Sequence, residues 1–411
     1  MELMPGFWAP KPSRVWNTLL GPLRHYYLRS FYKISGITLD GIEHLSVIKA
    51  GDGALLAPNH SHDSDPHVMM DVGHRMGRQL YFMAAWQVFL AHHGIDGWVM
   101  QRFGAFSVDR EGCDRRAIRQ ATELLTAGKW LVVFPEGEIY HTNERLTPLR
   151  EGVAFMAVTA QRDLEKTKSE HRIWVVPTCI RYTYDQDITP RLDQTVAAME
   201  RRLMIKTKAG AALHERIVTL GDMLLTIKEK EQLGHSTEGE GDLPARLNRL
   251  INHLLVRHEK EYFGKTSDGD SVPLRVKVLR RAILEKLAAE HSNQPAESTA
   301  PARSTQHAPL VPPAAQSALD DLHLVLQLYS YPGDYVSSKP TVERMAETIE
   351  KFEEDLDGFS APKGTRRAGV RFAPPIDVGP FLAARPRAAS IEITAKLEES
   401  IRFLMNDKVT R

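Results

Sequence analysis

The chain has 411 residues, of which 42% are hydrophobic and 26% charged, so it has enough apolar material for ordinary globular cores. At about 100–200 residues per domain, this length allows two or three domains, or one large domain with an insertion. Lys and Arg (53) nearly balance Asp and Glu (52), and a net charge of +1 argues against a protein that covers nucleic-acid phosphates with its whole surface.

Cysteine content and hydropathy indicate the kind of cellular compartment in which the chain is expected. Cys113 and Cys179 are too few for a disulfide framework or a four-thiolate zinc site, so we expect a reducing compartment. The longest apolar run, residues 80–91, is too short for a spanning helix. Prolines interrupt the N-terminal stretch that a signal peptide needs. We therefore expect neither secretion nor a transmembrane span.

The N-terminal segment, residues 1–36, is rich in aromatic residues and cations. Residues 1–39 hold five cations and one anion, a net charge of +4. The apolar spacing predicts two short amphipathic helices with a break at Gly21-Pro22, the second continuing to Ile34. One interpretation is a membrane-associating segment, with aromatic rings at headgroup depth and cations on anionic lipid. The other is a pair of helices packed on the domain core.

Apolar and helical stretches alternate from residue 37 to 184. The apolar runs predict five strands: 54–58, 80–84, 105–108, 130–135 and 173–177. The clearest helix between them, residues 116–127, ends at Gly128. This order predicts an α/β fold with a mixed, largely parallel sheet flanked by helices.

The rest of the chain changes in composition. Residues 185–290 predict an α-helical insertion, and the Pro-, Ala- and Ser-rich residues 291–316 predict a disordered linker. Residues 317–365 predict a helical segment. In residues 366–411 a lone strand precedes a closing helix at 388–405, and because one strand cannot stand alone, we expect it to return to the sheet of residues 37–184.

Polar residues concentrate directly after the predicted strand 54–58, where α/β proteins place ligands. Pro66 suits the first turn of a helix and Asp65 the cap before it, which favours an ionised Asp65 near the positive end of the helix. Asp65 can accept from one ring nitrogen of His60 and leave the other free to take a proton. The alternative is a plain helix cap with solvent-facing histidines.

The same run also offers donors for a metal ion, namely His60, His62, Asp63, Asp65 and His67. It is loosely similar to the His-x-His-x-Asp-His run of metallo-β-lactamase-like hydrolases. In this chain the aspartates fall at 63 and 65, on either side of the position which that run requires. A metal-dependent hydrolase is therefore the alternative function of a different class.

Three blocks together resemble, in order and spacing, the glycerol-phosphate and lysophosphatidate acyltransferase superfamily. His60 and Asp65 match its His-x4-Asp motif. Two later blocks match its Gly-x-Phe-x-x-x-Arg and Phe-Pro-Glu-Gly motifs: Gly104, Phe106 and Arg110, then Phe134, Pro135, Glu136 and Gly137. A fourth, weakly defined Val-Pro block falls at Val176-Pro177, and the tail at 369–382 is similar to that family's last strand. The resemblance covers residues 37–184 and 366–411.

The resemblance implies an acyltransferase that uses His60 as general base, oriented by Asp65. The acceptor hydroxyl, on a lysolipid or glycerol-phosphate-like molecule, attacks the thioester of acyl-CoA or acyl-carrier protein, and neither a covalent enzyme intermediate nor a further cofactor is implied. Gly104 and Arg110 belong to the implied substrate site, where Arg110 would bind a phosphate. Glu136 with the Gly137 backbone would shape the acceptor pocket. The alternative for Arg110 is a surface ion pair with a nearby carboxylate.

The chain departs from the family pattern after Phe-Pro-Glu-Gly, where Thr-Arg is common. Here Glu138 and Ile139 follow, so an anion replaces a cation at a place that would contact acceptor phosphate. Either Arg150 or another cation substitutes, or the acceptor is not a phosphomonoester. The alternative is that Glu138 turns away to pair with Arg145 or Arg150.

The expected partners are membrane lipids and an acyl carrier, with no nucleic acid. The expected location is the cytoplasmic side of a membrane, peripheral or monotopic.

Overall fold

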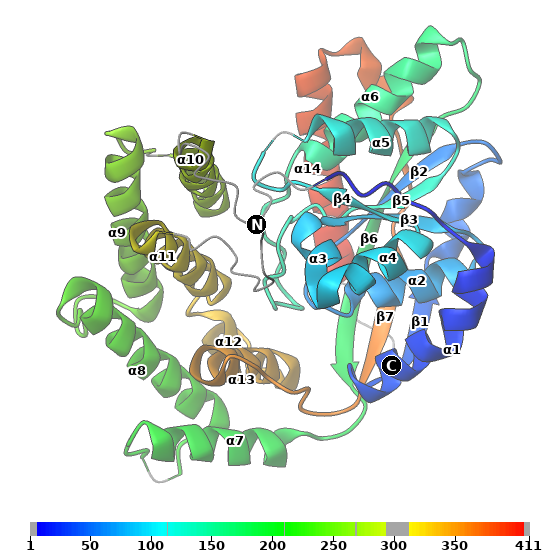
Figure 1. Ribbon diagram of the computed structural model, residues 1–411. Helices are drawn as coiled ribbons and strands as arrows, with labels where there is room; N and C mark the ends of the chain where they lie inside the picture. Colours follow the sequence, from blue (N-terminus) through cyan, green and yellow to red (C-terminus); the bar gives the residue numbers. More distant parts are fainter. Residues whose placement is uncertain (1–5, 113, 209, 268, 293–311, 407–411) are drawn as a thin grey trace, which may run out of the picture. The chain divides into compact units, whose positions relative to one another are not determined.

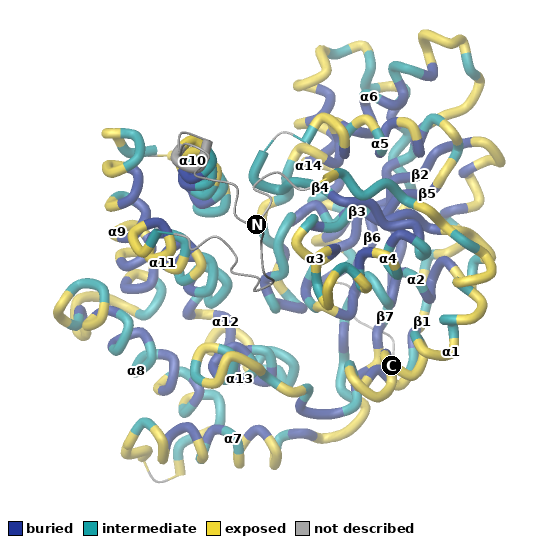
Figure 2. Tube along the Cα trace, in the orientation of Figure 1, coloured by how far each residue is buried: buried dark blue, intermediate teal, exposed yellow. Residues whose placement is uncertain are grey.

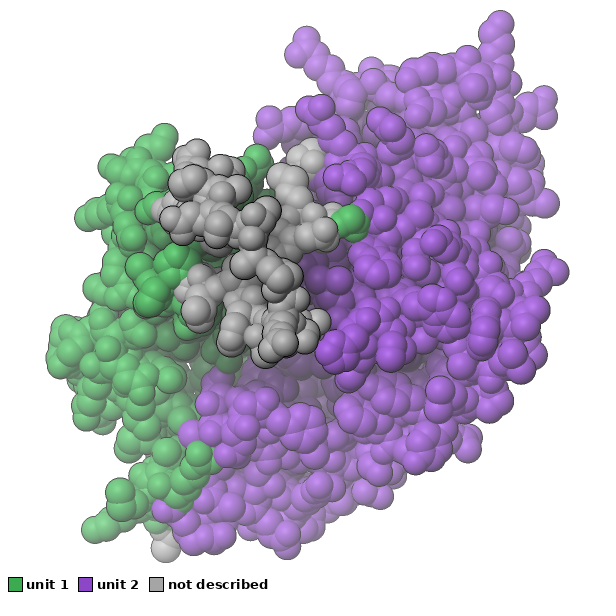
Figure 3. Space-filling model, in the orientation of Figure 1, with its two compact units in different colours: residues 1–6, 110–113, 202–339 green, residues 7–109, 114–201, 340–411 purple. Residues whose placement is uncertain are grey.

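The computed structural model describes residues 6–112, 114–208, 210–267, 269–292 and 312–406 (Figure 1). These residues form two compact units (Figure 3). An α/β unit comprises Phe7–Asp109, Asp114–Arg201 and Pro340–Arg411, and a helical unit is built mainly by Arg202–Lys339. Residues 293–311 of the predicted linker lie outside the described residues. Its two ends are helical, which corrects the predicted boundaries 291 and 316.

An eight-stranded mixed sheet organises the α/β unit, in the order β1-β7-β6-β2-β5-β3-β4, with β8 pairing β6 beside β7. The strands are β1 (Ile34–Asp40), β2 (Gly53–Pro58), β3 (Leu80–Ala85), β4 (Ala105–Val108), β5 (Trp130–Val132), β6 (Ile173–Tyr184), β7 (Arg366–Phe372) and β8 (Ile376–Asp377). Strands β6, β2, β5, β3 and β4 are parallel, and β7 runs antiparallel to β6. The predicted mixed, largely parallel sheet flanked by helices is confirmed, as is the return of the last long strand to it.

Two strands differ from the prediction. β6 continues to Tyr184, seven residues past Pro177. Pro177 lacks an N–H, but it falls between the part of β6 that pairs with β8 and the part that pairs with β7, so little of the ladder is lost. β1 was not predicted, and Ile34 begins this strand instead of continuing a helical face.

Helices cover both faces of the sheet (Figure 1). One face carries α5 (Arg115–Thr126), α6 (Gly152–Lys166) and α14 (Pro386–Asn406). The other carries α1 (Arg14–Ser30), η1 (Ile42–Val47), α2 (Asp65–Arg75), α3 (Trp86–Leu90), η2 (Ala91–Gly94) and α4 (Ile95–Arg102). The unit also contains α7 (Thr189–Arg202), α13 (Val342–Asp357), which contacts β6, and η3 (Gly379–Ala383).

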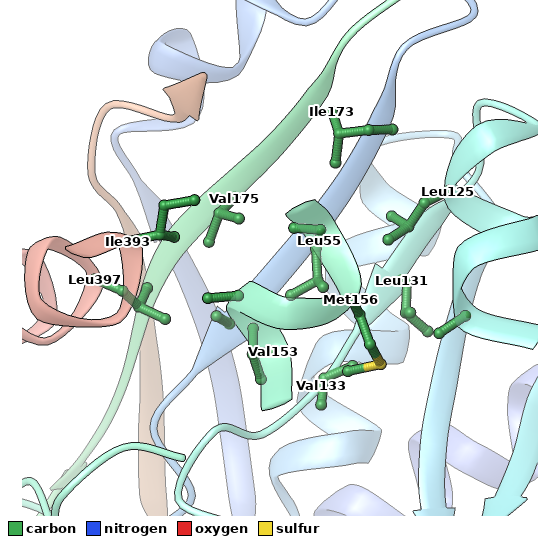
Figure 4. Close-up of a cluster of buried hydrophobic side chains, with 14 of the residues drawn as sticks. Leu55, Leu125, Leu131, Val133, Val153, Met156, Ile173, Val175, Ile393 and Leu397 are labelled. Atoms are coloured by element: carbon green, nitrogen blue, oxygen red, sulfur yellow. The ribbon is translucent and has the colours of Figure 1, made fainter. Parts of the chain in front are cut away.

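Alternating strand residues build two apolar cores, one on each face of the sheet. Leu55 packs under α5, α6 and α14, while its neighbour Leu56 packs on the opposite face. Figure 4 shows the first core, where Leu55 lies among Val153 and Met156 of α6 and Leu397 of α14. Because β2 is buried on both faces, it is a continuous apolar run.

The N-terminal segment forms one helix instead of the predicted two. α1 begins after Ser13, whose hydroxyl accepts from the Trp16 N–H, and it continues through Pro22. Pro22 is exposed, so solvent can satisfy the carbonyl that loses its helical donor. Most of α1 is exposed (Figure 2). No helix among the described residues is both long and apolar enough to cross a membrane.

The helical unit contains α8 (Leu213–Leu233), α9 (Leu243–Phe263), α10 (Val272–Ser292), α11 (Pro313–Ser330) and α12 (Tyr335–Ser338). α9, α10 and α11 share a Leu-rich core. Buried ion pairs join its elements: Arg246 Nη2 lies 2.7 Å from Glu229 Oε2, and Arg275 Nε lies 2.7 Å from Glu259 Oε1.

Candidate active site

The residues that follow β2 form the centre of the candidate site. His60 and Asp65 come together at the C-terminal end of this strand, with His60 Nδ1 2.9 Å from Asp65 Oδ2. Asp65 is fully buried, whereas the His60 side chain keeps 14% of its surface exposed. α2 begins at Asp65 with Ser64 in the cap position, so the predicted cap was one residue too late.

Asp65 turns back toward the loop, away from the N–H groups of its own helix. Its Oδ2 accepts the backbone N–H groups of Ser61 at 2.9 Å and His62 at 3.0 Å, besides His60 Nδ1. Its Oδ1 accepts the Tyr182 hydroxyl at 2.5 Å. A carboxylate can only accept, so the His60 proton sits on Nδ1 and the lone pair on Nε2. The site therefore presents a base at Nε2.

The turn after β5 holds His60 from the other side. The Phe134 ring stacks on the imidazole, with centroids 3.9 Å apart and an interplanar angle of 20°. Glu136 Oε1 accepts the His60 backbone N–H at 2.7 Å, while Oε2 accepts both the N–H and the hydroxyl of Thr147. Burial raises the pKa of Glu136, and these hydrogen bonds oppose the rise. Glu136 thus fixes the backbone of His60.

Gly137 closes that turn, and its N–H lies 3.2 Å from the Phe134 carbonyl oxygen. Its φ of +78° favours glycine, and an added Cβ would lie 2.5 Å from Arg150 Nε. The turn therefore packs against the Arg150 guanidinium. Arg150 is the cation that we named above as a candidate replacement for the arginine that commonly follows Phe-Pro-Glu-Gly in the family.

Residues 37–181 match a protein-family model described as Acyltransferase. The chain carries an acyltransferase domain. This confirms the resemblance to the glycerol-phosphate/lysophosphatidate acyltransferase family for that segment. Comparison with curated proteins gives no match.

Two asparagine side chains extend the sheet of the acyltransferase domain beyond the end of β2. Asn59 pairs with both peptide groups of Ile180: its Nδ2 donates to the carbonyl at 3.0 Å, and its Oδ1 accepts the N–H at 2.7 Å. Asn143 does the same with Tyr182, at 2.7 and 2.8 Å. These amides take the place of a neighbouring strand along one edge of β6, while β7 pairs with its other edge up to Tyr184.

The strand register places the Gly-x-Phe-x-x-x-Arg block relative to His60. Ala105 aligns through β3 and β5 with Leu56, so Gly104 is level with Leu55, well before His60. Gly104 has a φ of +92°, and a Cβ there would lie 3.0 Å from the Leu80 carbonyl oxygen. Its structural role is therefore the turn into β4.

Arg110 lies two residues past the end of β4. By the same register, Val108 is level with Asn59, although β5 and β3 lie between β2 and β4. Residues 110–112 belong to the helical unit. Asp114, just after this stretch, caps α5 by accepting the N–H groups of Arg116 and Ala117.

Glu138, the anion at the place where the family commonly has Thr-Arg, follows Gly137 and is half-buried.

The predicted metal donors do not converge. Among the described residues, no group of three or more His, Cys, Asp or Glu side chains is arranged to hold a metal ion. His62 bonds to Ser64 and to Arg366, and His67 packs against the rings of Tyr27 and Tyr32. No observation therefore favours the hydrolase alternative.

Two residues that contact the dyad or its supports escaped the sequence-based prediction. Tyr182 and Asn143 belong to none of the family blocks. The available signal was the alternation Ile180, Tyr182, Tyr184, which is typical of a strand that continues past Pro177. For Asn143 no local pattern gives a signal.

Proposed function

We propose that the acyltransferase domain moves a fatty acyl group from the thioester of acyl-CoA or acyl-carrier protein to a hydroxyl of a lysolipid or glycerol-phosphate-like acceptor. The observation that carries the proposal is the 2.9 Å contact between His60 Nδ1 and Asp65 Oδ2 inside the segment that matches the family. The acyl carrier is a co-substrate, and the reaction calls for no further cofactor.

The proton of the acceptor hydroxyl can reach the leaving sulfur through His60. The acceptor hydroxyl gives its proton to Nε2 as its oxygen bonds to the thioester carbonyl carbon. The carbon–sulfur bond then breaks, and the proton on Nε2 passes to the departing sulfur. The products are an ester and a free thiol, and His60 returns to its starting state. Asp65 stabilises the transient imidazolium and holds the ring in place.

Other residues select the acceptor in this proposal. Arg110 binds a phosphate or another anionic group, and the turn of Glu136 and Gly137 shapes the acceptor pocket with Gly104 supporting β4. The negative charge of Glu138 disfavours a phosphomonoester and favours a zwitterionic, amino-acid or glycolipid acceptor.

Purified protein, labelled acyl-CoA and a panel of lysolipids test the reaction. We expect His60→Ala to lower acyl transfer by about 10²- to 10⁴-fold, the usual effect of losing a general base. His74→Ala, an exposed histidine near the end of α2, serves as the control and should keep full activity. Full activity in His60→Ala contradicts the proposal.

We further propose that α1 associates peripherally with the cytoplasmic side of a membrane. Leu19, Leu23 and Tyr26 on this helix are 63%, 61% and 67% exposed. Trp16 continues this surface to Trp98 of α4, with ring centroids 5.0 Å apart. Such an aromatic and aliphatic face is suited to the headgroup boundary of a bilayer.

The cations around α1 supply the electrostatic part of this membrane contact. Arg14, Arg29 and Lys33 are exposed, whereas the Arg24 side chain is only 9% exposed and its Nη2 lies 3.4 Å from Asp71 Oδ1. Each exposed cation near an anionic bilayer contributes about 1 kcal/mol, and salt weakens it.

Flotation with anionic liposomes tests this surface without disturbing the core. We expect the triple change Leu19→Glu, Leu23→Glu and Tyr26→Glu to abolish flotation, and high salt to weaken that of the wild type. The matched control, Leu274→Glu with Val278→Glu, places charges on exposed apolar residues of α10 and should float normally. Undiminished flotation of the triple variant rules the surface out.

A further inference from the structure

A chain of hydrogen-bonded polar side chains, most of them buried, leads from β7 to Asp65 Oδ1, the oxygen that does not contact His60. Arg366 Nη2 lies 2.9 Å from His62 Nε2, and His62 Nδ1 lies 2.8 Å from Ser64 Oγ. Ser64 Oγ lies 2.9 Å from the Tyr182 hydroxyl, which lies 2.5 Å from Asp65 Oδ1. Four links therefore connect a residue of the last long strand to the dyad.

Only one direction of hydrogen bonding satisfies both ends of this chain. A guanidinium can only donate, so His62 Nε2 accepts from Arg366 and the His62 proton lies on Nδ1. That proton is donated to Ser64, whose hydroxyl donates to Tyr182, and the Tyr182 hydroxyl donates to the carboxylate. The Ser64 N–H is 3.1 Å from His62 Nδ1, but bonding there needs the other tautomer, with a proton facing Arg366.

The charges around these groups keep each one in the required state. Burial and then the Arg366 charge hold the pKa of His62 well below its ordinary value, so the ring is neutral. Burial and then the Asp65 charge raise the pKa of Tyr182 well above its ordinary value, so its hydroxyl keeps the proton. Tyr182 is therefore a permanent donor to Asp65.

The donors on Asp65 divide between its two oxygens. Oδ2 receives His60 Nδ1 and two backbone N–H groups, all from the loop 60–62. Oδ1 receives the Tyr182 hydroxyl, which comes from β6 and is 117 residues away. With the carboxylate fixed at both oxygens, it cannot rotate away from His60.

We infer that Tyr182, held in direction by Ser64, His62 and Arg366, is a positioning residue that fixes the Asp65 carboxylate in the orientation required by the His60 base. This inference rests on the proposed acyl transfer. It assigns a function to His62, which was a candidate metal donor, to Ser64, and to Arg366, which is 304 residues away from His62 in the sequence.

Tyr182→Phe tests the inference because it removes one oxygen and keeps the ring. We expect kcat to fall about 10- to 100-fold, the usual result of losing a hydrogen bond to a charged group, with the KM values for donor and acceptor within twofold. The matched control is Tyr184→Phe, two residues further along β6, whose hydroxyl lies 3.4 Å from Glu350. It should keep wild-type kcat.

A second variant and a spectroscopic readout distinguish loss of the positioning role from loss of the folded structure. Ser64→Ala leaves Tyr182 in place but removes its donor, and we expect a smaller fall in kcat. The downfield imidazole N–H resonance that disappears in His60→Gln should shift in Tyr182→Phe and stay unchanged in Tyr184→Phe. This signal reports the His60–Asp65 contact without turnover.

The outcomes separate this inference from the proposed function. If the wild type transfers acyl groups, His60→Ala does not, and Tyr182→Phe matches Tyr184→Phe in kcat and in the imidazole resonance, the inference is wrong. If the wild type shows no transfer with any donor, the proposed function fails, and an unshifted resonance in Tyr182→Phe still overturns the positioning role.

Discussion

The helical unit and the candidate active site both bury carboxylates, but they compensate the charge differently. In the helical unit Glu229 and Glu259 each face a buried guanidinium, from Arg246 and Arg275. Beside His60, the hydrogen bonds to Asp65 come from a ring N–H, a hydroxyl and two backbone N–H groups, and among the described residues none comes from a guanidinium. In the helical unit a guanidinium neutralises each of the two buried carboxylates. Asp65 carries a negative charge that no described guanidinium neutralises, so this charge can act on His60.

The pKa values of the acidic groups follow this contrast. Burial raises the pKa of Glu136, and its hydrogen bonds do not reverse the rise. Burial also opposes ionisation of Glu229, but hydrogen bonds from Arg246 and Thr237 outweigh it and lower the pKa of Glu229 to about 2. Hydrogen bonds to neutral groups hold the Glu136 carboxyl, whereas the ion pair with Arg246 keeps Glu229 ionised.

The largest expected effect comes from breaking a pair in the helical unit. Arg246→Met leaves Glu229 buried without its cation, and we expect a loss of about 3–5 kcal/mol in the free energy of unfolding. Adding Glu229→Leu should recover most of that loss, because the uncompensated charge is gone. Denaturant unfolding followed by circular dichroism at 222 nm gives the free energy of unfolding of both variants.

Arg249→Met is the control for this experiment. Arg249 lies on the same helix, and its partner Glu240 and the arginine itself are exposed. An exposed pair contributes about 0–1 kcal/mol, so the control should change stability little. Equal losses in the two arginine variants contradict the contrast between buried and exposed pairs.

The next effect concerns acid. Burial and then the Arg24 charge lower the pKa of His67 to about 4, and burial and then the Lys351 charge lower that of His141 to about 3. Their unfolded-state pKa is 6.5. The unfolded chain therefore binds these protons more readily, so this stability is complete above pH 6.5 and is lost as the pH falls toward 4 and 3. His67 alone accounts for up to about 3 kcal/mol.

The helical unit should resist acid further, because the stability from Glu229 is complete above its ordinary pKa of 4.5 and is lost only as the pH falls toward 2. Tryptophan emission reports the α/β unit alone, since all six tryptophans lie in it: Trp8, Trp16, Trp86, Trp98, Trp130 and Trp174. Helices of both units contribute to the signal at 222 nm, so we expect this emission to change at a higher pH than the last part of that signal. His67→Phe should reduce the pH dependence, and an unaltered pH profile in that variant disproves the assignment.

The smallest effect concerns acceptor choice. If the charge at Glu138 acts on the substrate, Glu138→Thr should raise the ratio of kcat/KM for lysophosphatidate over a zwitterionic lysolipid about 5- to 10-fold, because a like charge is removed. Glu165→Thr removes the same charge from the exposed face of α6 and should leave the ratio as it is. An unchanged ratio in Glu138→Thr means that this residue does not select the acceptor.

Local patterns predicted much of the sheet and the central pair of the site. Strands buried on both faces, such as β2, are apolar runs that stand out in the sequence. His60 and Asp65 lie five residues apart, so a single turn can bring their side chains within hydrogen-bond distance. Both follow from short-range constraints.

What the patterns missed depends on distant partners. β1 has alternating burial over few residues, and its neighbour β7 lies more than 300 residues further along the chain. Tyr182 meets Asp65 because β6 continues beyond the end of β2, where Asn59 and Asn143 bond to one edge of it and β7 pairs with the other. Arg366 reaches His62 from β7. No local spacing encodes these contacts.

The sheet order also dictates when the protein can assemble during synthesis. β1 pairs with β7, which in turn separates it from β6. The N-terminal strand therefore has no place in the sheet until the ribosome has made residues 366–372. Throughout most of translation α1 is attached to a strand that has no partner. The nascent chain acquires Arg366 at the same time as the strand that joins β1 to the rest of the sheet.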